Sequence, residues 1–217
     1  MDPTAPRPEF EDDHTEGLQL PPWERRERFG FLNALYLTVK DVLLTPGRFF
    51  HRMPSLVGIL QPLLFAVVLG GVGTFIAWLY SLVSSSLQMA LFGDFSHGQS
   101  SLISFLLFIF SPVLMTMGIF IQAGLIHGAL MLLGGNRLGF EATFRVSAYS
   151  EATTVILLLP VCGSWVAMIW SMVILIIGLY NIHEIDPWKA VVAVLAPLLL
   201  CFMVVGGSIV ATMTGMN

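Results

Sequence analysis

Charged side chains are missing from four long stretches of the chain. No Lys, Arg, Asp or Glu occurs in residues 53–93, 95–136, 152–183 or 190–217. A soluble domain needs charged groups over most of its length to face water, whereas a membrane-spanning helix needs roughly 20 apolar residues in succession. The pattern therefore predicts an integral membrane protein.

The apolar runs predict five transmembrane helices, at about residues 56–82, 102–133, 140–160, 163–180 and 189–212. The second run is too long for an untilted crossing and should tilt, kink or protrude. The third is ambiguous, because its first half carries ionisable residues and only its second half is plainly apolar. The predicted fold class is an all-α membrane protein, a bundle of five transmembrane helices.

Pro112 is the candidate kink in the second predicted helix, since proline removes a backbone donor from the helix interior.

The residues before the first apolar run divide into two parts. Residues 1–22 contain prolines and an acidic cluster, a composition that predicts a disordered tail. Residues 23–53 predict a cytoplasmic amphipathic interfacial helix followed by a short second one, ahead of the five-span membrane domain at 54–217. The amphipathic pattern places one set of apolar side chains on a single helical face: Leu32, Leu35, Tyr36, Val39 and Leu43. This face has two compatible settings, the membrane interface and the protein's own bundle.

Positive charge predicts the orientation. Seven of the 10 Lys and Arg residues precede residue 56, and the other three are Arg137, Arg145 and Lys189. With five spans and a cytoplasmic tail, all of them fall on the cytoplasmic side, as the positive-inside rule requires. The N-terminus is therefore expected in the cytoplasm and the C-terminus on the opposite side.

The opening of the third apolar run carries a candidate functional polar cluster, Glu141, Arg145, Tyr149 and Glu151. Glu141 and Arg145 are four residues apart and can pair on one helical face, with Tyr149 four further along. Glu151 lies on another face and deeper toward the membrane, where a charge is costly unless it is paired or hydrated. The cluster is either an ion pair that anchors the helix at the interface or a substrate or ion path lined by Arg145 and Glu151.

Five arginines near the N-terminus are candidate lipid-contacting residues: Arg25, Arg26, Arg28, Arg48 and Arg52. A cation near an anionic membrane surface contributes about 1 kcal/mol to binding. Nucleic-acid binding is not expected, because there is no basic stripe with interleaved aromatic residues.

Small residues recur at a spacing that lets helices approach closely. The candidate helix-packing residues are Gly70, Gly124, Gly128, Gly207 and Ala211. These stripes predict packing within one bundle or a homodimer face.

The sequence contains no catalytic motif, so we expect no enzyme, no cofactor and no metal site. His183, Glu184 and Asp186 are potential metal ligands, but solvated charges in a short loop explain them as well. His127, inside the second run, is either a hydrogen-bonded packing residue or part of a proton relay.

Three segments together resemble the Yip family, the Ypt/Rab-interacting membrane proteins, in its prokaryotic branch. They are Thr45-Pro46-Gly47-Arg48-Phe49-Phe50, the run FEATFRVSAYS at 140–150, and Gly178-Leu179-Tyr180-Asn181-Ile182-His183 followed by Lys189-Ala190. The resemblance implies a five-helix bundle with a cytosolic N-terminus, in the inner (plasma) membrane of a bacterium. Eukaryotic relatives act in vesicle trafficking and bind Rab-type GTPases or other family members.

Two functions follow as hypotheses. The first is a non-enzymatic membrane scaffold or accessory protein that acts through membrane lipids and through a membrane-protein partner or a homo-oligomer. The alternative is a small transporter or channel for an ion, lipid or small solute.

Overall fold

The computed structural model describes residues 18–92, 101–160 and 162–214, and throughout these residues the regular structure is helical. Side-chain surroundings are not described for residues 84–105 or for most of the last helix beyond Leu200. The helices occur in the following order, with η for 3₁₀-helices: η1 (Pro22–Arg25), α1 (Arg26–Phe29), α2 (Phe31–Leu44), α3 (Pro46–Arg52), α4 (Leu60–Phe92), α5 (Ser101–Leu132), α6 (Gly139–Ser150), η2 (Glu151–Leu158), α7 (Gly163–His183) and α8 (Pro187–Thr214).

Three of these helices are long and apolar enough to cross a membrane. Among the described residues the qualifying stretches are Leu60–Val83 in α4, Leu106–Leu132 in α5 and all of α7, and a shorter apolar stretch covers Pro187–Leu200 in α8. At most a third of each crossing window is buried inside the protein. The rest is apolar surface that only lipid or a partner can cover.

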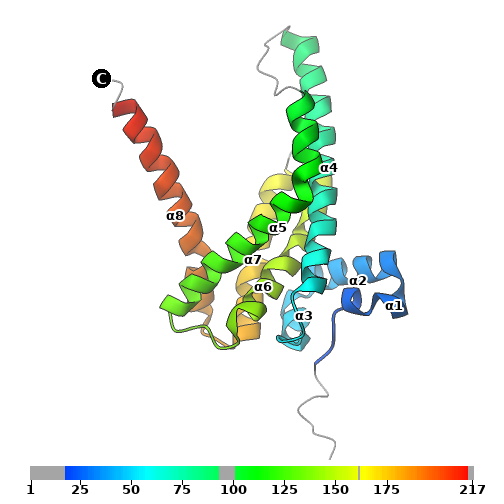
Figure 1. The fold of residues 1–217 in the computed structure, drawn as a ribbon, viewed down its shortest axis with the longest axis vertical. Coiled ribbons are helices and arrows are strands. Elements are labelled where there is room, and N and C mark those ends of the chain that lie inside the picture. Colours follow the sequence, from blue (N-terminus) through cyan, green and yellow to red (C-terminus); the bar gives the residue numbers. More distant parts are fainter. Residues whose placement is uncertain (1–17, 93–100, 161, 215–217) are drawn as a thin grey trace, which may run out of the picture.

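α5 runs beside α4 at its start and then turns away across the bundle (Figure 1). The helix contains Pro112, and the Thr116 hydroxyl donates a hydrogen bond to the Pro112 carbonyl. A proline inside a helix is one of the few established causes of a bend. The predicted tilt or kink of this segment therefore has a direct structural counterpart.

The third predicted span is an α-helix continued by a 3₁₀-helix, α6 followed by η2. Hydroxyl groups at the junction donate back to carbonyls three residues earlier, from Ser150 to Ser147 and from Thr153 to Ser150. Such bonds compete with the regular helical pattern. Neither piece alone is long enough to cross a membrane, although together they pass along α4 toward Tyr80, whose hydroxyl donates to the Leu158 carbonyl at 3.1 Å.

The N-terminal segment (residues 22–53, η1 to α3) packs on the bundle, with α2 lying crosswise to α4 (Figure 1). Trp23, Phe50 and Met53 are buried in the main hydrophobic core. Packing on the protein's own bundle, one of the two predicted settings, is confirmed for Leu35, Val39 and Leu43, which pack against the main core. Phe31, Leu32 and Tyr36 remain more than half exposed.

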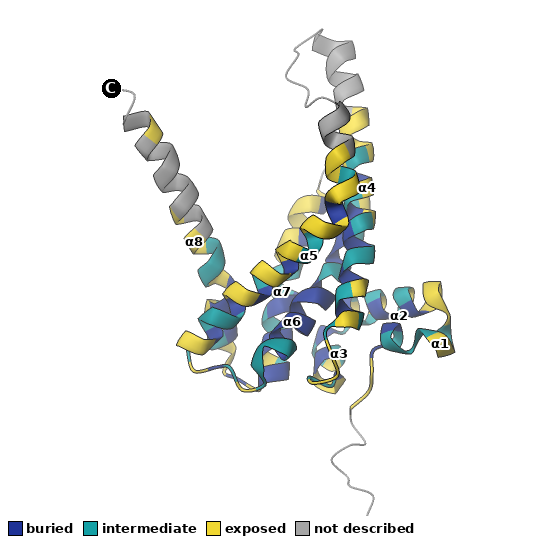
Figure 2. Cartoon of the chain, in the orientation of Figure 1, coloured by how far each residue is buried: buried dark blue, intermediate teal, exposed yellow. Residues whose placement is uncertain are grey.

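The main core lies at one end of the molecule, around α6 (Figure 2). Every residue of α6 from Ala142 to Ser150 is buried. Close approach is possible there because Gly178 of α7 faces Val146 and Phe50, where an added Cβ would come within 2.5 Å of the Val146 side chain. The most polar of the predicted spans is thus the central one.

Candidate functional site

A buried ion pair joins α6 to the N-terminal segment. The Arg145 side chain is fully buried, and its Nη2 donates to Oε1 of Glu24, whose side chain is 5% exposed. Taking two charges out of water is costly, so such a pair persists only where further hydrogen bonds satisfy both groups. The arrangement around this pair supplies most of those bonds.

Tyr149 is the second donor to the same carboxylate oxygen. Its hydroxyl lies 2.6 Å from Oε1 of Glu24, and its ring packs against Phe49 at 5.2 Å and Phe65 at 5.1 Å between centroids. The carboxylate of Glu24 therefore accepts one hydrogen bond from a charged group, Arg145, and one from a neutral group, Tyr149, whose ring packs against two phenylalanines.

Glu141 and Arg145 both bind the backbone of Gly58, in the loop between α3 and α4. The Gly58 amide donates to Oε1 of Glu141 at 2.5 Å, and its carbonyl accepts from Nη1 of Arg145 at 2.8 Å. Gly58 adopts a φ of +97°, a conformation that side chains other than glycine rarely take. One residue of this loop is thereby fixed on both sides by consecutive turns of α6.

The predicted pairing of Glu141 with Arg145 is therefore wrong. Within the described residues the arginine's ion pair is with Glu24, and Glu141 binds the Gly58 amide instead. Sequence spacing put the two groups on one face correctly. It did not account for the N-terminal segment, which brings a carboxylate to Arg145 from the opposite side.

Trp23, next to Glu24, positions the N-terminal segment against the start of α4. Its backbone amide donates to the Thr38 hydroxyl and its indole Nε1–H donates to the Gln61 carbonyl, both at 2.8 Å. Arg26 stacks on the Trp23 ring and donates to Oε1 of Gln61 at 2.5 Å. The first residues of α4 are thus tied to η1 and α1.

Glu151 stands apart from this cluster. It is half-buried, and its carboxylate accepts from the Thr154 hydroxyl at 3.4 Å. In the described part of the chain no hydrogen bond or ion pair joins it to Arg145. The structure brings Glu141, Arg145 and Tyr149 together and leaves Glu151 outside.

A second polar chain links α5, α6 and α7 through Thr143. The Thr143 hydroxyl lies 3.1 Å from Nδ1 of His127 and 3.0 Å from Nε2 of His183. Because Nδ1 of His183 accepts from the Leu138 amide, its ring proton sits on Nε2 and points to Thr143, whose own proton then points to His127. The hydrogen bond predicted for His127 is therefore present, and it joins the residue to Thr143.

His183 is not a solvated loop residue, as the sequence pattern had suggested. It ends α7 and is fully buried, whereas Glu184 and Asp186 are exposed. Among the described residues no group of three or more His, Cys, Asp or Glu side chains is placed to hold a metal ion.

The five candidate lipid-contacting arginines lie in two environments. Arg26 is engaged with Gln61 and Trp23, and Arg25 and Arg28 lie against the Phe29 ring. Arg48 and Arg52 are exposed on α3.

The candidate packing glycines also divide. Gly70 faces the Met115 side chain of α5, where an added Cβ would come within 2.7 Å, so its role in packing the bundle is confirmed. Gly124 and Gly128 have open space where a Cβ would be, so packing within the bundle is wrong for these two. Gly207 and Ala211 lie in α8 outside the described side chains.

Gly73 is the closest helix contact that the pattern missed, since an added Cβ would come within 2.3 Å of the Thr154 side chain of η2.

Glu24, Gly58 and Thr143 are the site residues that the sequence did not single out. One signal was available for Glu24. A lone arginine in an apolar span needs a carboxylate, and the acidic residues of the N-terminal segment are as eligible as the neighbour four residues away. Gly58 and Thr143 carry no such signal, because their roles depend on contacts made only in the folded chain.

Comparison with known proteins gives one match. The family model described as the Yip1 domain matches residues 40–209, which include α4 to α7, most of α8 and all the α6 residues of the site. Comparisons with curated proteins and with solved structures gave no match. In general terms the family comprises non-enzymatic membrane proteins. With helices able to span a membrane and a family model that covers most of its length, the chain belongs to the Yip family.

Proposed function

We propose that the protein is a non-enzymatic scaffold or accessory protein of the membrane, of the prokaryotic branch of the family, acting through protein and lipid contacts. The observation that carries the proposal is the docking of the N-terminal segment on the bundle through Glu24 and Arg145. A segment held in this way presents a fixed surface to lipids and partners. A solute path would instead leave polar groups facing an open cavity.

The topology we propose has five crossings, with the N-terminus in the cytoplasm and the C-terminus across the inner membrane of a bacterium. Two observations support the third crossing. Tyr149 packs on Phe65 near the start of α4, and Leu158 meets Tyr80 near the end of its apolar stretch, so α6 and η2 together run along most of the apolar length of α4. The positions of the basic residues support the orientation.

Membrane contact by α2 is supported by its surface. Leu32 is 75% exposed and Tyr36 is 63% exposed, on a helix that lies crosswise to α4. Helices of this kind bury an apolar face at the acyl boundary while their charged residues stay at the head groups.

The depth of α2 is testable with single-cysteine labels in a cysteine-free background. A fluorophore at Leu32 should be quenched by spin-labelled lipid more strongly than one at the neighbouring exposed Asn33, which lies on a different face of the helix. Equal quenching at both positions would contradict an interfacial α2.

The transport alternative is weakened by the burial of Arg145. Both terminal nitrogens of its guanidinium group are bonded to protein acceptors, and the side chain has no exposed surface. It cannot meet a solute unless Glu24 leaves. Glu151 lies outside the cluster, and its described hydrogen bond is with Thr154, so no contact among the described residues joins the two residues of the predicted path.

A pull-down through the N-terminal tail in mild detergent, followed by native mass spectrometry, tests the proposed function. A stoichiometric partner protein, or a self-dimer with retained anionic lipid, is the expected result. A monomer that carries a small solute or ion would contradict the scaffold and favour transport. Gly124→Leu is the variant that addresses the self-dimer. Gly124 is one of the small residues predicted to form a homodimer face, and a side chain added there would meet no other part of the bundle within 4 Å.

A further inference from the structure

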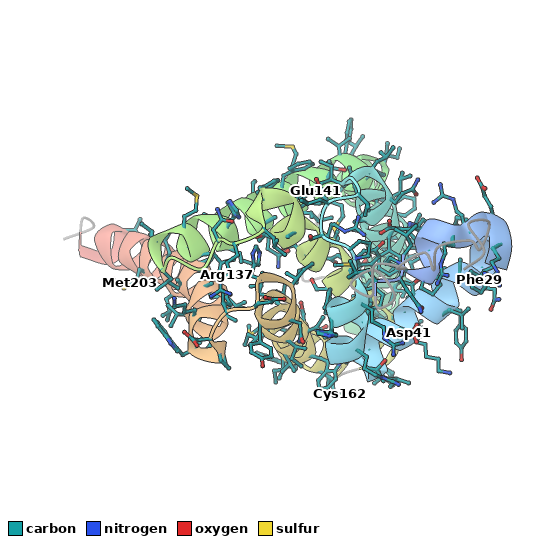
Figure 3. The ribbon with its side chains drawn as sticks, turned by 90° about the horizontal axis from the view of Figure 1, so that it is seen from below. Phe29, Asp41, Arg137, Glu141, Cys162 and Met203 are labelled. Carbon is teal, nitrogen blue, oxygen red and sulfur yellow. The ribbon has the colours of Figure 1, made fainter. Side chains whose placement is uncertain are left out.

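A cavity of about 240 Å³ opens between η1, the end of α2 and α3, and three arginines line it. They are Arg25 from η1 and Arg48 and Arg52 from α3, and Asp41 is the one acidic residue among the lining residues. Figure 3 shows Asp41 where α2 and α3 approach each other on the face seen from below. The balance of three cations against one carboxylate leaves the lining with a net positive charge.

In the part of the chain that the structure describes, these arginines form no ion pair. Within the described residues the ion pair that forms is that of Glu24 with Arg145, so none of the three has a carboxylate within 4.0 Å. Nε of Arg25 is buried without a hydrogen-bond partner. A buried donor without a partner costs free energy comparable to a lost hydrogen bond. Arg48 and Arg52 are exposed on α3, so their guanidinium groups are the ones that an oxyanion in the cavity would meet first.

Apolar side chains also line the cavity: Leu20, which is 37% exposed, and the partly buried Phe49. Arginine groups recognise phosphate through paired N–H bonds, whereas apolar side chains beside them favour a hydrocarbon chain. A free phosphate ion would satisfy only the first of these features.

We propose that this arginine pocket, lined by Arg25, Arg48 and Arg52, binds the phosphate of an anionic phospholipid head group. The inference rests on the proposed membrane contact of the N-terminal segment and names its ligand. The volume is about that of eight water molecules at roughly 30 Å³ each, enough for a phosphate and part of its ester. The acyl chains would leave the pocket past Leu20.

The test is titration of the delipidated full-length protein with short-chain phosphatidylglycerol, followed by native mass spectrometry. Phosphatidylcholine and inorganic phosphate serve as comparison probes. We expect one phosphatidylglycerol per chain, bound more tightly than either probe. Arg48→Gln with Arg52→Gln should weaken binding by roughly tenfold for each arginine removed, and Asp41→Asn should strengthen it.

Lys40→Gln is the matched control, because Lys40 is an exposed cation of the N-terminal segment that does not line the pocket. It should leave the dissociation constant unchanged. Arg48→Lys with Arg52→Lys keeps the charge but removes the paired N–H donors, and it should also weaken binding.

Three results would overturn the proposal. Equal losses in the control and pocket variants would mean general attraction of charge. Full binding by the lysine variant would mean that no shaped site exists. Inorganic phosphate that binds as tightly as the lipid would reassign the pocket to a soluble anion. None of these results concerns partner capture by the tail, so a failed pocket and a failed scaffold are distinguishable.

Discussion

Glu24 and Arg145 lie 121 positions apart in the sequence and form a buried ion pair in which the arginine is fully shielded from solvent. Removing one partner of such a pair leaves an uncompensated charge, which costs about 3–5 kcal/mol. We expect Glu24→Ala to release the N-terminal segment from the bundle. Limited proteolysis in detergent should then cut the chain before α2 much faster than in the wild type.

Glu27→Ala is the matched control for Glu24→Ala, because Glu27 is exposed one turn away. It should leave the cleavage rate unchanged. If both variants are cleaved at the wild-type rate, the pair does not hold the segment.

Gly58→Ala should destabilise the protein by about 1–3 kcal/mol. The cost comes from the backbone, since φ is +97° and an added Cβ would meet no atom within 4 Å. Gly71→Ala should instead stabilise the protein. Gly71 lies in a helix and has the same open space, and alanine is favoured over glycine in a helix by roughly 0.5–1 kcal/mol. Thermal unfolding in one detergent compares the two, and a shift of the same sign in both would contradict the account of Gly58.

Gly73→Ala should weaken the contact between α4 and η2 by about 1–3 kcal/mol, because the Thr154 methyl group would have to move. Gly118→Ala on α5 has open space and should be neutral or slightly stabilising. Thermal unfolding in one detergent should show a lower midpoint in the first variant alone. An unchanged midpoint would show that the contact is easily remodelled.

Thr143→Val should cost about 1–3 kcal/mol, because it removes the hydroxyl shared by His127 and His183 and leaves a ring nitrogen of the buried His183 unpaired. Thr143→Ser keeps the hydroxyl and should cost less. Unfolding in a series of SDS concentrations measures both. A serine variant as unstable as the valine variant would assign the effect to the lost methyl group instead of the hydrogen bonds.

The membrane helices were predictable because lipid exposure leaves a direct mark on the sequence. α4, α5 and α7 coincide with charge-free apolar runs. The ends of α5 and α7 fall within a few residues of the prediction, whereas α4 continues to Phe92, well beyond the predicted end at about residue 82. The 3₁₀ geometry of η2 leaves no such mark, because an apolar run looks the same in either helix type.

The polar site was only half predictable. Local spacing placed Glu141, Arg145 and Tyr149 on one face, and the structure uses that face. The partner was misassigned because sequence proximity favours a neighbour four residues away, whereas the fold brings in a carboxylate from another element. His183 was misassigned for a related reason, since a residue at a helix end appears solvated until the neighbouring helices are in place.

The two hydrogen bonds between α6 and the Gly58 backbone have a mechanical consequence. Sliding α6 along α4 by one helical turn, a displacement of 5.4 Å, would break both bonds to the Gly58 backbone at once. A pull on the tail by a partner passes through Glu24 to Arg145, and so reaches the centre of the bundle without first unwinding α2. Force applied to the N-terminal segment is therefore delivered to α6, which continues into the 3₁₀-helix η2 from Glu151 onward.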